Sequence, residues 1–186
     1  MISTNDMRPG QTLEIDGTLF TIIQYQHVKP GKGQAFVKTK LKNVKSGAVT
    51  ERTFRADEKV NLAVLDKREM QYLYRDDAGL VFMDNESYEQ VHVDPDLLGD
   101  AVKFLKDSTV CNVPVYEGTP IGIDLPVTMV LEVTETEPGV KGDRVSGALK
   151  AATLETGATV QVPLFVETGD KVKVDTRSGE YISRVQ

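Results

Sequence analysis

The sequence predicts an all-β protein made of small barrels. Apolar and polar residues alternate along most of the chain, which is the period-2 pattern of half-buried strands. Short turns that contain glycine interrupt this alternation at the spacing of β-hairpins. The 186 residues leave room for up to three barrels of about 60 residues each. With 40% hydrophobic and 27% charged residues, the composition is that of a folded globular protein.

The first third of the chain contains two hairpin signals. Asp16-Gly17 separates candidate strands at 13–15 and 19–25, and this dipeptide tolerates the positive φ angles of a tight turn. Ser46-Gly47 separates a second pair at 35–41 and 49–54. We therefore expect two antiparallel pairs in this region.

Hairpin signals continue to the C-terminal end. Each is a turn with glycine, most of them between two strand-like runs. These turns are Asp77-Ala78-Gly79 between residues 70–74 and 80–83, Glu117-Gly118-Thr119-Pro120 between residues 110–116 and 121–125, Thr156-Gly157, and Ser178-Gly179.

One segment departs from the strand pattern and predicts a short helix. Asp94 is placed to cap it, Pro95 would occupy its first helical position, and Gly99 would weaken it. A helix that bridges strands of a five-stranded barrel fits the oligonucleotide-binding fold. The apolar residues at helical spacing within 96–106 are Leu97, Leu98, Ala101, Val102 and Leu105.

The distribution of charge divides the chain into three parts. Residues 1–64 carry ten Lys/Arg and six Asp/Glu, residues 65–127 five and thirteen, and residues 128–186 seven and nine. The net charges are therefore +4, −8 and −2 on a chain whose total is −6. The net charge changes sign near residues 64–66, and the Leu-Pro-Val segment at 125–127 is the second candidate boundary. We therefore predict three domains at 1–64, 65–127 and 128–186.

Composition and motifs exclude several classes of protein. No stretch approaches the roughly 18 apolar residues of a membrane span, and residues 1–6 lack the features of a signal peptide. A single cysteine, Cys111, forms no internal disulfide, and two histidines offer no zinc pattern. We therefore expect a cytoplasmic protein with no membrane contact, no structural metal and no cofactor.

The sequence contains no catalytic constellation either. His27 and His92 lie in strand-like runs without a supporting motif, and Cys111 has the surroundings of a small buried hydrophobe. The acid pair Asp76-Asp77 borders a turn. The segment around Lys32 lacks the glycine and the Ser/Thr of a phosphate-binding loop. We therefore do not expect an enzyme.

A cationic strip stands out on this acidic chain. The 34 residues 17–50 contain six lysines and no acidic residue. Within the strip, Lys40 and Lys42 are candidate RNA contacts, and a solvated hairpin face is the alternative interpretation. At one tip, Pro30 fixes a φ angle and Gly31 and Gly33 remove side-chain bulk on either side of Lys32, which is presented alone.

Several long motifs occur in order along the whole chain. They are residues 29–36, Thr53-Phe54-Arg55-Ala56, Tyr88-Glu89-Gln90, residues 153–158 and 162–166, and residues 174–184. Together they resemble the family of bacterial translation elongation factor P. The resemblance implies a basic N-terminal SH3-like (KOW-like) barrel followed by two oligonucleotide-binding (OB) barrels, arranged as an L that imitates tRNA.

The resemblance also implies a function. Members bind the ribosome between the peptidyl and exit sites, contacting both subunits beside peptidyl-tRNA, and relieve stalling at consecutive prolines. By this resemblance Lys32 meets the acceptor end of that tRNA and is a candidate for an extension added by a modifying enzyme. Its supporting tip comprises Lys29, Pro30, Gly31, Gly33 and Gln34.

Further contacts follow from the resemblance at the other end of the chain. Gly142 and Asp143 match a loop that faces messenger RNA, where Arg144 replaces an expected threonine. Tyr181 and Arg184 match functional residues near the C-terminus, although Tyr181 is equally suited to a barrel core. A factor that must enter a ribosomal site is expected to be a monomer.

Two alternative functions remain. A general single-strand nucleic-acid binder would use such barrels, but it should show aromatic platforms in a basic groove. Here the chain after Val64 is acidic and Trp is absent. A paralogue with a specialised role is the other alternative, and the intact tip around Lys32 favours the main factor.

Overall fold

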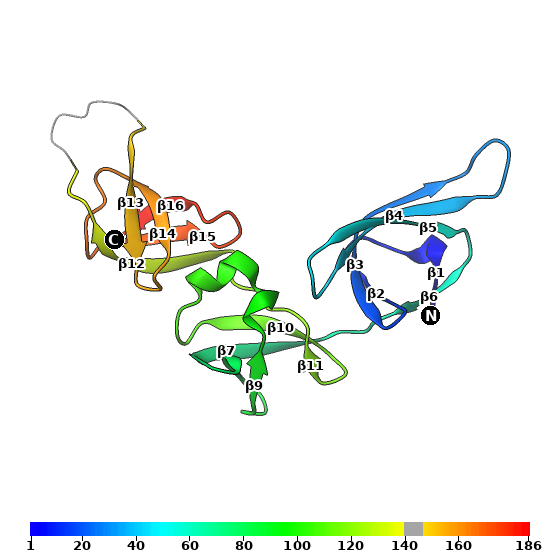
Figure 1. Cartoon of the computed structure of the whole chain (residues 1–186), viewed down its shortest axis with the longest axis horizontal. Helices are drawn as coiled ribbons and strands as arrows, with labels where there is room; N and C mark the ends of the chain where they lie inside the picture. The colour runs from blue at the N-terminus through cyan, green and yellow to red at the C-terminus, as the bar shows by residue number, and fades with distance from the viewer. Residues whose placement is uncertain (140–146) are drawn as a thin grey trace. The chain divides into compact units, whose positions relative to one another are not determined.

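Antiparallel pairing of neighbouring segments organises the whole chain. The computed structural model describes residues 1–139 and 147–186. Within these residues the strands form three antiparallel sheets of six, five and five strands, and the helical segments are short 3-10 turns (Figure 1). This confirms the all-β fold class.

The first sheet has the strand order β1-β6-β2-β3-β4-β5 and encloses its own apolar core. Both expected hairpins are present, and Asp16 and Gly17 adopt φ angles of +51° and +76° in the turn between β2 and β3. A short 3-10 helix, η1 (Thr4–Asp6), follows β1. The strands are β1 (Ile2–Ser3), β2 (Thr12–Ile15), β3 (Thr18–Val28), β4 (Phe36–Asn43), β5 (Val49–Arg55) and β6 (Lys59–Leu62).

The second sheet has the order β11-β10-β7-β8-β9. The expected strand at 121–125 is wrong: after the turn, β11 is two residues long, and only Asp124 makes an isolated bridge, to Asn112. Pro114, opposite Ile121, accepts a hydrogen bond from the Ile121 N–H but has no N–H to return one, so the regular ladder stops there. The strands are β7 (Asp66–Asp76), β8 (Gly79–Asp84), β9 (Gln90–Val93), β10 (Val110–Tyr116) and β11 (Thr119–Pro120).

The expected helix forms as two 3-10 helices, η2 (Pro95–Leu97) and η3 (Gly99–Phe104). The Asp94 side chain accepts a hydrogen bond from the N–H of Asp96, 2.9 Å away, which confirms the cap. Gly99 takes a φ of +56°, outside the helical region, and separates the two turns. The glycine therefore divides the segment instead of only weakening it.

The third sheet has the order β14-β13-β12-β15-β16 around a core of buried Val, Leu and Ala side chains. Phe104 from η3 is 1% exposed and belongs to the same core cluster. The strands are β12 (Thr128–Thr136), β13 (Leu149–Leu154), β14 (Thr159–Pro163), β15 (Lys171–Asp175) and β16 (Tyr181–Val185).

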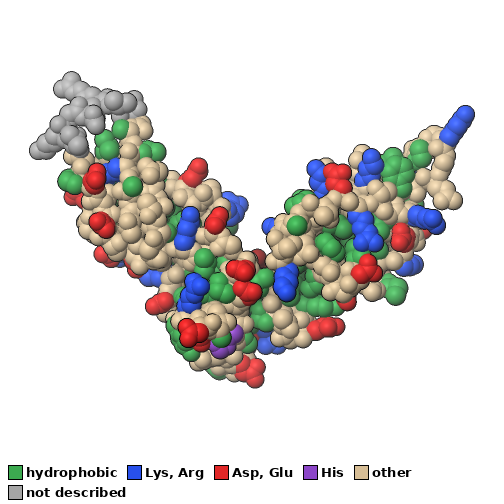
Figure 2. Space-filling view, viewed as in Figure 1, with side chains coloured by type: hydrophobic (Ala, Val, Ile, Leu, Met, Phe, Trp, Pro, Cys, Tyr) green, Lys and Arg blue, Asp and Glu red, His purple; other side chains and the backbone are tan. Residues whose placement is uncertain are grey.

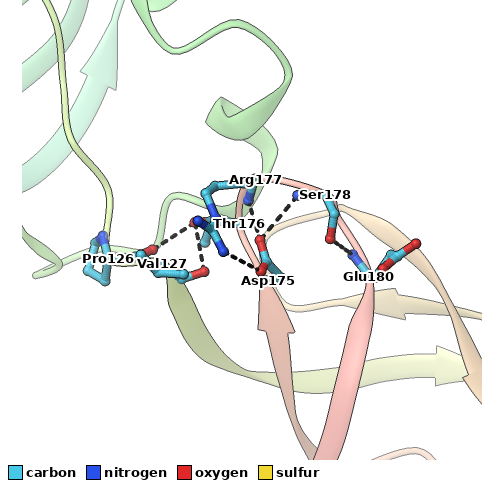
Figure 3. A network of polar contacts seen from close by, with 7 residues as sticks. All are labelled: Pro126, Val127, Asp175, Thr176, Arg177, Ser178 and Glu180. Carbon is cyan, nitrogen blue, oxygen red and sulfur yellow. Dashed lines mark hydrogen bonds and ion pairs between the residues drawn. The ribbon is translucent and has the colours of Figure 1, made fainter. Parts of the chain in front are cut away.

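A polar network ties the start of the third sheet to the β15–β16 turn (Figure 3). The buried Oγ1 of Thr176 lies 2.7 Å from the carbonyl oxygen of Pro126 and 3.1 Å from that of Val127. Asp175 accepts hydrogen bonds from the N–H groups of Arg177 and Ser178. The Arg177 side chain and these N–H groups lower the pKa of Asp175.

The chain folds into two compact units, each built from segments that are not continuous in sequence. One contains residues 1–68 with 113–122, and the other contains residues 69–112 with 123–186. The three-domain division at residues 64 and 127 stays a prediction. No helix among the described residues has the length and apolarity needed to cross a membrane.

Candidate nucleic-acid interface

The hairpin of β3 and β4 carries the tip at residues 29–35. The ladder between the two strands ends at the pair Val28 and Phe36, and the hairpin extends beyond the rest of its sheet (Figure 1). Residues 29–34 are all exposed, including Lys29, Gln34 and Lys32. Among the described residues, none forms a hydrogen bond or an ion pair with the Lys32 side chain. The ammonium group is therefore available to a ligand.

The two glycines of the tip act differently. Gly33 has a φ of +110°, a conformation that side chains rarely adopt, so the turn requires glycine there. Gly31 has no positive φ, and a Cβ at this position would meet nothing within 4 Å. Gly31 therefore keeps the tip narrow without being needed for its backbone conformation.

A row of lysines covers the outward face of β4. Lys38, Lys40 and Lys42 are exposed, whereas Val37, Thr39 and Leu41, which alternate with them, are buried, as the geometry of a strand dictates. Lys38 was not singled out from the sequence, although its two-residue spacing from Lys40 predicts that it lies on the same face. We call Lys38, Lys40 and Lys42 the lysine face.

A shallow groove of about 280 Å³ lies beside the lysine face. Gln26 and Gln24 of β3 stand opposite Lys38 and Lys40, and Glu51 of β5 lies 3.8 Å from the Lys40 ammonium group. In Figure 2, blue Lys and Arg side chains are spread over the unit that contains the first sheet, with some red Asp and Glu side chains among them. The groove thus offers cations and amide groups, which suit phosphate and sugar oxygens.

Tyr181 and Arg184 lie on the same face of β16, although residues three apart on a regular strand face opposite sides. A register shift at Lys173 and Val174 explains this: Tyr181 pairs with Val174, and Arg184 pairs with Val172. Both valines are fully buried, so Tyr181 and Arg184 leave the strand on its core side, although the end of the Arg184 side chain reaches the surface and is 43% exposed. Tyr181 packs against that core, which agrees with the interpretation of Tyr181 as a barrel core residue.

Arg184 is held from two directions. Its guanidinium carbon lies 5.2 Å from the centroid of the Phe165 ring, and Nη1 donates to Oδ2 of Asp170 at 3.4 Å. The N–H of Glu167 also donates to that oxygen at 3.0 Å. This backbone hydrogen bond, and then Arg184, lower the pKa of Asp170. No local sequence signal pointed to Phe165 or Asp170, because both lie far from Arg184 along the chain.

The other residues considered in the sequence belong neither to the lysine face nor to the surroundings of Arg184. Gly142, Asp143 and Arg144 lie outside the described residues. Cys111 is buried, which raises the pKa of its thiol to about 11 and keeps it protonated at neutral pH. His92 lies 2.8 Å from Asp76 on the surface, and this hydrogen bond lowers the pKa of Asp76.

No group of three or more His, Cys, Asp or Glu residues with the arrangement of a metal site occurs in the part of the chain that the structure describes.

Models of one protein family match nearly the whole chain. The elongation factor P KOW-like domain matches residues 3–60, the elongation factor P OB domain residues 65–123, and the elongation factor P C-terminal domain residues 129–184. Elongation factor P of Moorella thermoacetica is 58% identical over 99% of this chain and all of its own length. That of Beutenbergia cavernae is 56% identical over the full length of both.

A solved structure titled eukaryotic translation initiation factor 5A from Methanococcus jannaschii has a similar fold. It matches with a TM-score of 0.57 at 21% identity, covering 67% of this chain and 91% of that one. A translation initiation factor eif-5a family protein from Naegleria fowleri matches with a TM-score of 0.52 at 13% identity, covering 67% of this chain and 96% of that one.

Proposed function

Because the chain belongs to the elongation factor P family and is a translation factor, we propose that it binds the ribosome beside peptidyl-tRNA and stimulates peptide-bond formation at consecutive prolines. In this proposal it occupies the space between the peptidyl and exit sites and contacts both subunits. The observation that carries the proposal is the exposed, unpaired Lys32 at the end of the β3–β4 hairpin, among the described residues.

The proposed mechanism is positional. The flexible Lys32 side chain donates hydrogen bonds to phosphate and ribose oxygens at the acceptor end of the tRNA. Holding that end in a reactive pose removes part of the entropic barrier to peptide-bond formation. The factor then acts without chemistry of its own and is not an enzyme.

The lysine face supplies the second part of the proposal. Lys38, Lys40 and Lys42 project from one face of one strand, so they can follow a single RNA backbone. Neutralising phosphates releases bound cations and strengthens association at low salt. This local positive charge overcomes the chain's net charge of −6 because screening limits the reach of the distant acidic residues to about 10 Å.

Other parts of the proposal follow from the family. An SH3-like barrel at 1–64 and OB barrels at 65–127 and 128–186 make up the chain, which acts as a cytoplasmic monomer. Lys32 is the target of a modifying enzyme. Gly142, Asp143, Arg144, Tyr181 and Arg184 contribute to RNA contacts at the C-terminal end.

In vitro translation tests the proposal. Two reporters are translated with and without the protein, one with consecutive prolines and a matched one without them. Full-length product from the proline reporter should rise several-fold, whereas the matched reporter should be unchanged. Equal yields of the proline reporter with and without the protein, in its form purified from native cells, would refute the function.

A further inference from the structure

Phe165 is an exposed aromatic residue with a cation on its ring. It follows β14 and is 58% exposed, whereas its neighbour Val166 is fully buried and anchors the segment in the core. The Arg184 guanidinium lies 5.2 Å from the ring centroid, within the range of a cation–π interaction. The backbone thus holds the ring at the surface, where it contacts the arginine.

The contacts of Arg184 leave part of its guanidinium available. The group carries five N–H donors in a planar fork. Nη1 donates to Asp170, and Nε and Nη2 have no hydrogen-bond partner among residues 1–139 and 147–186. The Arg184 side chain is 43% exposed. Two fixed contacts and free donors are the arrangement of a pre-oriented binding group, because little side-chain freedom is lost when a ligand binds.

We propose that Phe165 is a positioning residue that holds the Arg184 guanidinium in the orientation in which it binds ribosomal RNA. This inference rests on the proposed function, in which Arg184 contacts RNA. Phe165 does not touch RNA itself. The ring, 5.2 Å from the guanidinium carbon, restrains the side chain so that the free Nε and Nη2 donors stay available to a phosphate or a base edge.

A residue that acts through Arg184 loses its effect when Arg184 is removed. Ribosome affinity should therefore be measured at one low salt concentration for the wild type, Phe165→Leu, Arg184→Ala and the double variant. Phe165→Leu should weaken binding by about two- to fivefold, the factor expected for an exposed cation–π contact. The double variant should bind no more weakly than Arg184→Ala alone.

Two further variants serve as controls. Phe165→Tyr keeps an aromatic face and should restore affinity. Val130→Thr changes another exposed apolar residue, on β12 of the same sheet, and should bind as the wild type does. The Nε–H proton of Arg184 should also show an upfield ring-current shift in the NMR spectrum of the free protein. Phe165→Leu should abolish this shift.

The outcomes separate the inference from the proposed function. If Arg184→Ala weakens binding but Phe165→Leu does not, or if the two effects add, the inference is wrong and the proposed function stands. A free protein without the ring-current shift also overturns the inference. If the wild type does not bind ribosomes, or if Arg184→Ala binds as the wild type does, the RNA contact fails and the inference fails with it.

Discussion

The hydroxyl of Tyr116 donates a hydrogen bond to Oε2 of Glu14 at 2.6 Å, across 102 positions of sequence. Glu14 lies on β2 of the first sheet and Tyr116 lies at the end of β10, and both belong to the same compact unit. The contact fastens the β10–β11 hairpin to the N-terminal barrel. A carboxylate acceptor makes this a charge-assisted hydrogen bond.

The Tyr116 contact predicts a loss of stability at high pH. The hydrogen bond to Glu14, with further contributions from desolvation and Glu117, raises the pKa of Tyr116 to about 12 from an ordinary value of 10.0. A raised pKa in the folded state stabilises the protein fully below pH 10, and this contribution is lost as the pH rises toward 12. The difference in thermal unfolding midpoint between the wild type and Tyr116→Phe should therefore shrink above pH 10. A difference that stays constant to pH 12 would contradict this.

Lys32→Ala should abolish the rescue of proline-stalled synthesis and leave stability nearly unchanged. An exposed turn side chain contributes within about 0.5 kcal/mol to the free energy of unfolding. In vitro translation measures the first effect and urea unfolding the second. Lys59→Ala, at an exposed position on β6, is the matched control and should keep full activity. Full rescue by Lys32→Ala would show that the tip is not required.

Lys32→Arg separates charge from the primary amine. The substitution keeps the positive charge but changes the donor geometry and removes the group on which a lysine-specific enzyme acts. It should fail in cells that depend on a modified lysine. Mass spectrometry of the peptide around Lys32, from protein made in its native cells, should show added mass. An unmodified peptide together with an active Lys32→Arg variant would rule out that requirement.

The lysine face predicts a reduced salt dependence of ribosome binding after substitution. Each phosphate contact contributes about one unit to the slope of log affinity against log salt concentration. Lys40→Gln and Lys42→Gln should each lower the slope by about this amount, and Lys38→Gln should do the same. The slope for Lys59→Gln should equal that of the wild type. If the lysine-face variants also keep the wild-type slope, these lysines are only solvated.

The buried hydroxyl of Thr176 should stabilise the third sheet. Thr176→Val keeps the shape but removes the hydroxyl donor to the Pro126 carbonyl, whereas the Val127 carbonyl keeps its hydrogen bond from the Thr176 N–H. The loss of the hydroxyl hydrogen bond should cost about 0.5–1.5 kcal/mol. Thr176→Ser keeps the hydroxyl and should lose less. Chemical unfolding measures both, and equal stability of Thr176→Val and the wild type would contradict this role.

Local patterns in the sequence determined much of the fold and the position of the tip. The alternation along β4 requires that Lys38, Lys40 and Lys42 share a face, because successive side chains on a strand point to opposite sides. Turn residues such as Asp16-Gly17 marked hairpins whose strands are adjacent in sequence, so that pairing involves only a short loop. Lys32 could also be singled out from the sequence, because the two strands that flank its tip are adjacent in sequence.

Only the tertiary structure decided the contacts between distant segments. The register shift that turns Arg184 toward the same side as Tyr181 depends on how β16 pairs with β15. Phe165 and Asp170 meet Arg184, and Tyr116 meets Glu14, because whole sheets bring them together. A one-residue change of register would reverse the face of every side chain on a strand, and no local pattern specifies that register at a bulge. The burial of the complete core selects one register, and with it the positions of these side chains.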